Sequence, residues 1–85
     1  MKRVAILGST GSIGTQALDI LSYYKDYKIV ALSANENIDI LEEQTLKYRP
    51  SKVAVVNSEK AALLRERLPD DISVLSGKQS LIELA

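Results

Sequence analysis

The sequence predicts an α/β fold built on a doubly wound parallel sheet. Short apolar runs rich in β-branched residues alternate with segments of helical periodicity, and the runs begin at intervals of a little over twenty residues. That rhythm is typical of βαβ units. A glycine-rich segment follows the first run, at the kind of strand–helix junction where such units bind ligands. No linker or low-complexity tract marks a boundary, so residues 1–85 are assigned to one truncated β-α-β-α-β-α-β array.

Four strands are predicted from the apolar runs. They are Arg3–Leu7, Tyr27–Ser33, Lys52–Val56 and Ile72–Ser76. The first and third runs are almost continuously apolar, as expected of parallel strands that helices cover on both faces.

The first predicted helix spans Ile13–Tyr24. Its apolar stripe carries, in order, Ile13, Ala17, Leu21 and Tyr24, with Leu18 beside them. This spacing of three and four residues places the side chains on one face of a helix, which we expect to pack on the sheet.

Two more helices are predicted, each ended by a proline. Ile38–Tyr48 follows Asn37, a suitable N-cap, and stops before Pro50. Its apolar stripe consists of Ile38, Leu41, Thr45 and Tyr48. Glu59–Leu68 follows Ser58, taken as its cap, and stops before Pro69. Its stripe consists of Ala61, Leu64 and Leu68.

The segment Gly8–Gly14, "GSTGSIG", predicts a dinucleotide site of the Rossmann-like kind. A helix N-terminus offers unpaired N–H groups and a positive dipole end to a pyrophosphate, provided that the backbone comes close. We expect Gly8 to make the tight turn, Gly11 to let the loop approach the phosphates, and Gly14 to let the first helical turn pack closely. An ordinary βα turn is the less favoured interpretation.

The side chains between these glycines are candidates for further contacts. Ser9, Thr10 and Ser12 supply hydroxyl groups, and Ser12 is also placed to cap the helix. Ile13 either contacts the ribose or nicotinamide or enters the core.

The spacing of the glycines and the end of the second strand both favour NADP over NAD. The loop is G-x-x-G-x-x-G, which is associated with the 2′-phosphorylated cofactor. NAD-preferring sites place a carboxylate at the second strand end, about 20 residues past the glycines. Here residues 32–35 read "LSAN", and Ser33, Asn35 and Asn37 are candidate donors to a 2′-phosphate. Asn37 is equally well explained as a helix cap alone, and Glu36 opposes the phosphate.

Composition and charge exclude several functions. Lysine plus arginine and aspartate plus glutamate each total 11, so the chain lacks the basic excess typical of proteins that bind nucleic acid or an anionic membrane. Without cysteine or histidine it has no thiol or imidazole chemistry.

The apolar run Val4–Gly8 is too short for a signal sequence or a membrane span, which predicts a cytoplasmic protein. The final "GKQSLIELA" reads as a turn and the opening of a helix, and we expect a fragment.

Several stretches resemble the 1-deoxy-D-xylulose 5-phosphate reductoisomerase family. They are "AILGSTGSIGTQALDIL" at 5–21, "IVALSANENIDIL" at 29–41, "YRPSKVAVVNSEKAALL" at 48–64 and "VLSGKQSLIEL" at 74–84. The resemblance implies a homodimeric oxidoreductase that uses NADPH and a divalent metal, Mg or Mn, to convert a phosphosugar into 2-C-methyl-D-erythritol 4-phosphate. It implies that residues 1–85 are the N-terminal portion of the NADPH-binding domain and inactive alone, with catalytic and metal-binding residues elsewhere.

The resemblance also implies which residues contact the cofactor. Thr10, Gly11, Ser12 and Ile13 match one group of contacts, and the triplet 35–37 matches a second, where members often have Gly-Lys-Asn. Asn37 agrees, whereas Asn35 replaces a glycine and Glu36 a lysine. The combined candidate set is Gly8, Thr10, Gly11, Ser12, Ile13, Asn35 and Asn37.

Two alternatives come from other functional classes. One is another NADP-dependent enzyme, a semialdehyde dehydrogenase or an extended short-chain type. The other is a small, non-enzymatic nucleotide-sensing module. The long match beyond the glycines disfavours the first alternative, and the uncapped C-terminal segment disfavours the second.

Overall fold

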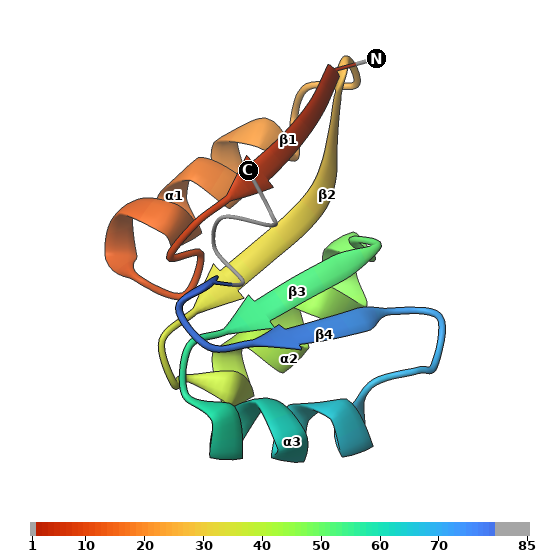
Figure 1. The fold of residues 1–85 in the computed structure, drawn as a ribbon. Coiled ribbons are helices and arrows are strands. Elements are labelled where there is room, and N and C mark those ends of the chain that lie inside the picture. The colour runs from red at the N-terminus through yellow and green to blue at the C-terminus, as the bar shows by residue number, and fades with distance from the viewer. Residues whose placement is uncertain (1, 80–85) are drawn as a thin grey trace.

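Strands and helices alternate throughout residues 2–79, the part of the chain that the computed structural model describes. The strands are β1 (Lys2–Ile6), β2 (Tyr27–Ala34), β3 (Lys52–Val55) and β4 (Ser73–Ser76). The helices are α1 (Ser12–Leu21), α2 (Ile38–Tyr48) and α3 (Ser58–Arg67) (Figure 1). The predicted β-α-β-α-β-α-β order is confirmed. Of the turn and helix opening expected in "GKQSLIELA", residues 80–85 lie outside the described residues.

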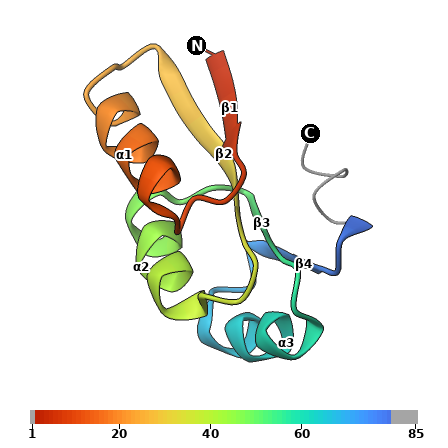
Figure 2. The same ribbon diagram turned by 90° about the vertical axis from the view of Figure 1, so that its left-hand side faces the viewer.

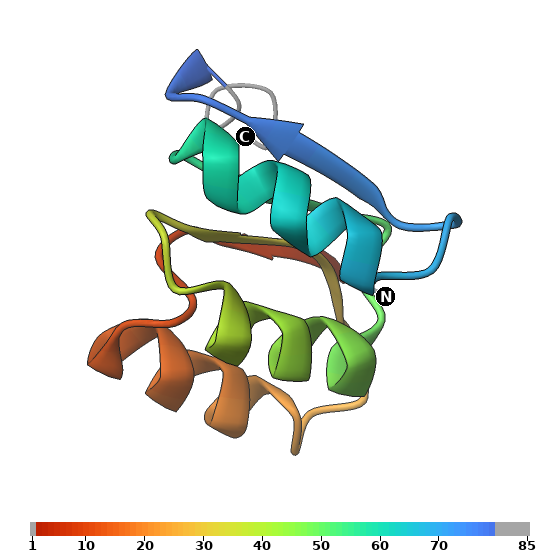
Figure 3. The ribbon, with the colours of Figure 1, turned by 90° about the horizontal axis from the view of Figure 1, so that it is seen from below.

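All four described strands are parallel and lie side by side in the order β1-β2-β3-β4. The Rossmann-like α/β fold is therefore confirmed. Because the chain adds each of these strands on the same side of the previous one, α1, α2 and α3 all lie on one face of the sheet (Figures 2 and 3). The reversal of strand order that puts helices on both faces of a doubly wound sheet is not among residues 2–79.

The main core lies between the helices and the sheet. Leu18, Leu41 and Leu64, one from each helix, are buried in a single cluster with Leu32 of β2 and Val53 of β3. The opposite face of the sheet carries a smaller cluster built around Ala31 and Ala54. Burial of each leucine contributes about 2 kcal/mol, so the helix-covered face supplies most of the hydrophobic stabilisation.

A β-bulge sets which residues of β2 face the helices. Val4 pairs with Ile29 but Ala5 pairs with Ala31, so β2 holds one extra residue against β1. Side chains alternate along a regular strand, which would put Ile29 and Leu32 on opposite faces. The extra residue brings both into the main core cluster.

The first helix is shorter than predicted and turned on its axis. It ends at Leu21, and the N–H groups of Tyr23 and Tyr24 bond carbonyls three residues back instead of continuing the α-helix. The buried stripe centres on Gly14 and Leu18, whereas Ile13 is 83% exposed and Tyr24 57% exposed. The prediction that Ile13 and Tyr24 belong to the packed stripe is wrong. The second and third stripes are confirmed, with Tyr48 at the edge of the core.

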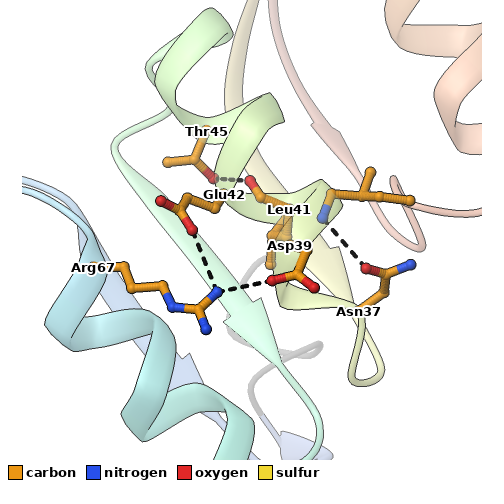
Figure 4. Close-up of polar contacts among 7 residues, drawn as sticks. Asn37, Asp39, Leu41, Glu42, Thr45 and Arg67 are labelled. Carbon is orange, nitrogen blue, oxygen red and sulfur yellow. Dashed lines mark hydrogen bonds and ion pairs between the residues drawn. The ribbon is translucent and has the colours of Figure 1, made fainter.

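The caps of the other two helices differ in how well they were predicted. The side-chain oxygen of Asn37 accepts a hydrogen bond from the Ile40 N–H at 3.3 Å, which confirms the cap of α2 (Figure 4). For α3 the cap is Asn57, whose oxygen accepts from the Lys60 N–H at 3.0 Å, and Ser58 is the first helical residue. The cap predicted at Ser58 is therefore wrong by one position.

An exposed ion pair links the C-terminal end of α3 to the start of α2. Arg67 donates to Asp39 at 2.9 Å and lies 3.4 Å from Glu42 (Figure 4). The hydrogen bond to Asp39 raises the pKa of the Arg67 guanidinium above its ordinary value. The pair helps fix the N-terminal end of α2, which borders the site described next.

Candidate functional site

The loops that follow β1 and β2 meet at the carboxyl edge of the sheet and enclose a cleft of about 280 Å³. Its lining residues are Leu7, Gly8, Thr10, Gly11, Ser33, Ala34, Asn35, Glu36 and Asn37. The N-termini of α1 and α2 follow directly from the two loops. A larger hollow of about 530 Å³, bordered by Arg3, Lys28 and Lys52, lies at the amino ends of the strands. Ligands of open α/β sheets bind at the carboxyl ends, so the smaller cleft is the candidate site.

Gly8 and Gly14 have the structural roles that the sequence predicts. Gly8 adopts φ +69°, a left-handed conformation that favours glycine, and so turns the chain sharply off β1. A Cβ on Gly14 would collide with the Gly8 carbonyl oxygen and would lie 2.7 Å from the Cα of Ser9. The first turn of α1 therefore packs directly on the backbone of its own loop, and no larger residue fits there.

Gly11 is free of such packing constraints. It is the N-cap of α1, with φ −75° and ψ 170°, angles that any residue adopts. A Cβ there would meet nothing nearer than the Gly8 carbonyl oxygen at 3.5 Å, an ordinary contact. Because Gly11 lines the cleft, the space beside it is open to a ligand.

The first turn of α1 keeps unpaired backbone donors. Within residues 2–79 no side chain caps this helix, so the cap predicted at Ser12 is wrong. Ser12, Ile13 and Gly14 are the first helical residues, whose N–H groups have no carbonyl one turn earlier to bond. Together with the helix dipole, these donors favour an anion at the edge of the cleft.

The side chains of the loop are divided between the interior and solvent. Ser9 is fully buried, and Thr10 is half-buried. Ser12 and Ile13 are exposed, and an apolar side chain that is 83% exposed beside unpaired donors is available to a bound ligand. Of the two alternatives for Ile13, burial in the core is excluded.

The second loop presents three exposed polar side chains to the cleft, from Asn35, Glu36 and Asn37. The cap of α2 uses the side-chain oxygen of Asn37, which leaves the amide nitrogen as a donor. The two interpretations of Asn37, cap and ligand-binding residue, are therefore compatible. Among the described residues that line the cleft, Glu36 is the one charged side chain. Attraction for a phosphate therefore comes from N–H groups and dipoles.

Ser33 has a different role from the one expected of it. It is 1% exposed, and its Oγ accepts the Gly8 N–H at 2.8 Å. Its carbonyl oxygen accepts both the N–H of Ser9 at 2.8 Å and the Ser9 Oγ at 3.2 Å. Ser33 therefore anchors the glycine loop to β2, and the suggestion that it donates to a 2′-phosphate is not supported.

The described residues contain neither a metal-ligand cluster nor a membrane-spanning helix. Among residues 2–79, no three carboxylate, histidine or cysteine side chains gather closely enough to hold a metal ion. In the same part of the chain, each helix is too short or too polar to cross a bilayer.

The chain is similar over its whole length to one family of enzymes. A family model described as 1-deoxy-D-xylulose 5-phosphate reductoisomerase matches residues 4–85. The reductoisomerase of Methylococcus capsulatus is 50% identical over 100% of this chain and 23% of its own length. That of Caldanaerobacter subterraneus subsp. tengcongensis is 47% identical, over 99% of this chain and 22% of its own.

A solved structure gives the same match in three dimensions. A DOX-P reductoisomerase in complex with NADPH, fosmidomycin and magnesium superposes with a TM-score of 0.91 and 33% identity. The superposition covers 99% of this chain and 21% of the solved one. The chain thus spans about a fifth of the length of the relatives that it matches.

Proposed function

The chain belongs to the 1-deoxy-D-xylulose 5-phosphate reductoisomerase family, and from that premise we propose that it forms the N-terminal portion of an NADPH-binding domain. The protein that contains it rearranges 1-deoxy-D-xylulose 5-phosphate and reduces the resulting aldehyde to 2-C-methyl-D-erythritol 4-phosphate. NADPH supplies the hydride for that reduction. The 85 residues alone bind the cofactor without catalysing the reaction.

The proposed contacts follow from the geometry of the cleft. The pyrophosphate lies over Gly11 and accepts hydrogen bonds from the first turn of α1, where Ser12 begins the helix. Thr10 and Gly8 line the adjoining wall, and Ile13 packs on an apolar part of the cofactor.

The adenosine end is proposed to reach the second loop. There the amide nitrogen of Asn37 and the side chain of Asn35 donate to the 2′-phosphate. The absence of a carboxylate from residues 32–35 supports NADPH over NADH. Glu36 acts against that preference.

The remaining properties belong to the protein as a whole. We propose that it is a cytoplasmic homodimer whose divalent metal, Mg or Mn, and phosphosugar substrate are bound by residues outside this chain. The magnesium complex of the related DOX-P reductoisomerase supports the metal.

One observation carries the proposal: unpaired donors of α1 border a cleft in which Gly11 leaves open space. Gly11→Val fills that space. We expect NADPH to bind the full-length variant at least tenfold more weakly by isothermal titration calorimetry. The free energy of unfolding should fall by about 1 kcal/mol or less, because the backbone angles suit valine and only the N-cap preference is lost.

A matched control adds similar bulk far from the cleft. Ala62→Val lies on the exposed side of α3 and should bind NADPH as the wild type does. If Gly11→Val keeps its affinity, the loop is structural and the cofactor lies elsewhere. If the wild-type protein itself does not bind NADPH, the proposed function is wrong.

A further inference from the structure

A buried glutamine from a distant helix holds the glycine loop. Gln44 of α2 is 8% exposed, and its Nε2 donates to the Ser9 carbonyl oxygen at 2.7 Å. Thr15 Oγ1 donates to the same oxygen at 3.2 Å. Both lone pairs of this carbonyl are therefore occupied, one by α1 and one by a residue 35 positions along the chain.

The orientation of this carbonyl decides where the next N–H group points. The peptide between Ser9 and Thr10 is planar and trans, so its C=O and N–H point in opposite directions. With the Ser9 oxygen drawn toward Gln44, the Thr10 N–H is directed to the other side of the loop. Thr10 lines the cleft proposed to hold the cofactor, and Gln44 does not.

The glutamine is poorly explained by packing alone. Its Oε1 is buried without a hydrogen-bond partner among the described residues. A buried, unsatisfied carbonyl is unfavourable, and an apolar side chain of the same length would avoid it. The contact that a methionine or leucine could not reproduce is the hydrogen bond to Ser9.

We propose that Gln44 is a positioning residue for the cofactor: it fixes the Ser9–Thr10 peptide so that the loop has its binding conformation before NADPH arrives. Ser33 holds the two preceding peptides, by accepting hydrogen bonds from the Gly8 and Ser9 N–H groups. The proposal rests on the function proposed above, in which the loop binds the pyrophosphate. Pre-organisation of this kind improves affinity because less ordering remains to be done on binding.

The test is Gln44→Met in the full-length protein, which keeps the length of the side chain and removes the donor. We expect the NADPH dissociation constant and the KM for NADPH to rise about five- to tenfold, the effect of losing one orienting hydrogen bond. The KM for the phosphosugar and kcat should change less than twofold, because Gln44 is buried and does not line the cleft.

Thr45→Val is the matched control. Thr45 neighbours Gln44, is fully buried, and donates its Oγ1 to Leu41 of its own helix at 2.7 Å (Figure 4). This variant also loses a buried hydrogen bond in α2 but none to the loop. It should lower the urea midpoint as much as Gln44→Met does, or more, and leave NADPH affinity unchanged.

A second variant, Gln44→Glu, tests the positioning role through the pH dependence of NADPH affinity, which a purely structural role would not change. A protonated carboxyl donates to the Ser9 oxygen, whereas a carboxylate repels it, and burial raises the pKa of such a group. The NADPH affinity of this variant relative to the wild type at the same pH should recover as the pH falls. The titratable groups lining the groove beside residue 44 are Asp19, Glu43, Lys47 and Tyr48. They are common to both proteins and cancel in the ratio.

The outcomes separate the two proposals. Wild-type NADPH affinity in Gln44→Met, or an equal loss of affinity in Thr45→Val, would overturn the positioning role while the proposed function stands. If the NADPH affinity of Gln44→Glu relative to the wild type does not change with pH, the positioning role is likewise overturned. If the wild type does not bind NADPH, the proposed function itself is wrong.

Discussion

The carboxylate of Glu36 borders the cleft between the two βα loops, where the 2′-phosphate of NADPH is proposed to lie. Its side chain is exposed, so water and salt weaken its field. Two unit charges about 7 Å apart in water interact by roughly 0.6 kcal/mol, and the phosphate carries more than one charge. A repulsion near 1 kcal/mol therefore opposes NADPH and leaves NADH almost unaffected.

Glu36→Gln should consequently tighten NADPH binding about two- to fivefold at low salt and leave the NADH dissociation constant unchanged. Titration calorimetry with both cofactors measures the ratio, and the gain should shrink as salt is added. Glu66→Gln, an equal charge change in the C-terminal half of α3, serves as the control. An equal gain for NADH would mean that Glu36 lies near the pyrophosphate and not near the ribose.

At single residues, the sequence predicted backbone geometry better than it predicted the direction of side chains. The turn at Gly8 and the close packing at Gly14 followed from the demands of a strand–helix junction. The direction of Ile13 did not, because the helical period places it near Ala17 and Leu21 on the packed stripe, whereas at the first turn of α1 it extends beyond the core and is exposed. The anchoring contacts of Ser33 and Gln44 join residues 24 to 35 positions apart, which no local pattern encodes.

Among the helices and strands, the N-cap of α3 shows what the sequence left undecided. The sequence where α3 begins reads "NS" at residues 57 and 58, and both residue types are good N-caps. The structure selects Asn57, whose backbone is extended and whose oxygen bonds the Lys60 N–H, with Ser58 in the first turn. Cap propensity alone could not decide which of the two residues is the N-cap, because that depends on where the extended backbone after β3 ends.

Asn57→Ala should lower the free energy of unfolding by about 1 kcal/mol, the usual loss when a cap is removed. Ser58→Ala should change it by a few tenths of a kcal/mol at most, since alanine suits the first turn. Chemical denaturation of the two variants measures the difference. The opposite ranking would place the cap at Ser58 and move the start of α3.

For the strands, the sequence predicted the positions but not the β-bulge. Their positions followed from apolar runs bounded by turns, and each predicted strand overlaps the one observed. The bulge opposite Val4 and Ala5 did not follow, because one extra residue in β2 leaves its composition unchanged. Its effect appears only in packing, where Ile29 joins Leu32 beneath the helices.

At the scale of the whole molecule, the chain is more open than a compact protein of its size. It exposes 5536 Å² for a mass of 9.3 kDa, whereas a compact monomer of that mass exposes about 5,000 Å². The reason is visible in the layers. All three described helices cover one face of the sheet (Figure 3), and the opposite face carries mainly small side chains such as Ala31 and Ala54. Less apolar area is buried per residue, so we expect low stability.

The 85-residue chain should accordingly unfold with a free energy of about 4 kcal/mol or less, near the bottom of the usual range for its length. A ligand that binds only the folded state stabilises it by RT ln(1 + [L]/Kd), about 2.7 kcal/mol at 100 times Kd. Urea unfolding followed by far-UV circular dichroism should therefore show a low midpoint that rises with NADPH concentration. The Gly11→Val chain should start from a somewhat lower midpoint without cofactor, and at the same NADPH concentration it should gain about 1.4 kcal/mol or less, because its affinity is at least tenfold weaker. A midpoint that NADPH leaves unchanged would mean that the cleft between the two βα loops does not bind the cofactor in this chain.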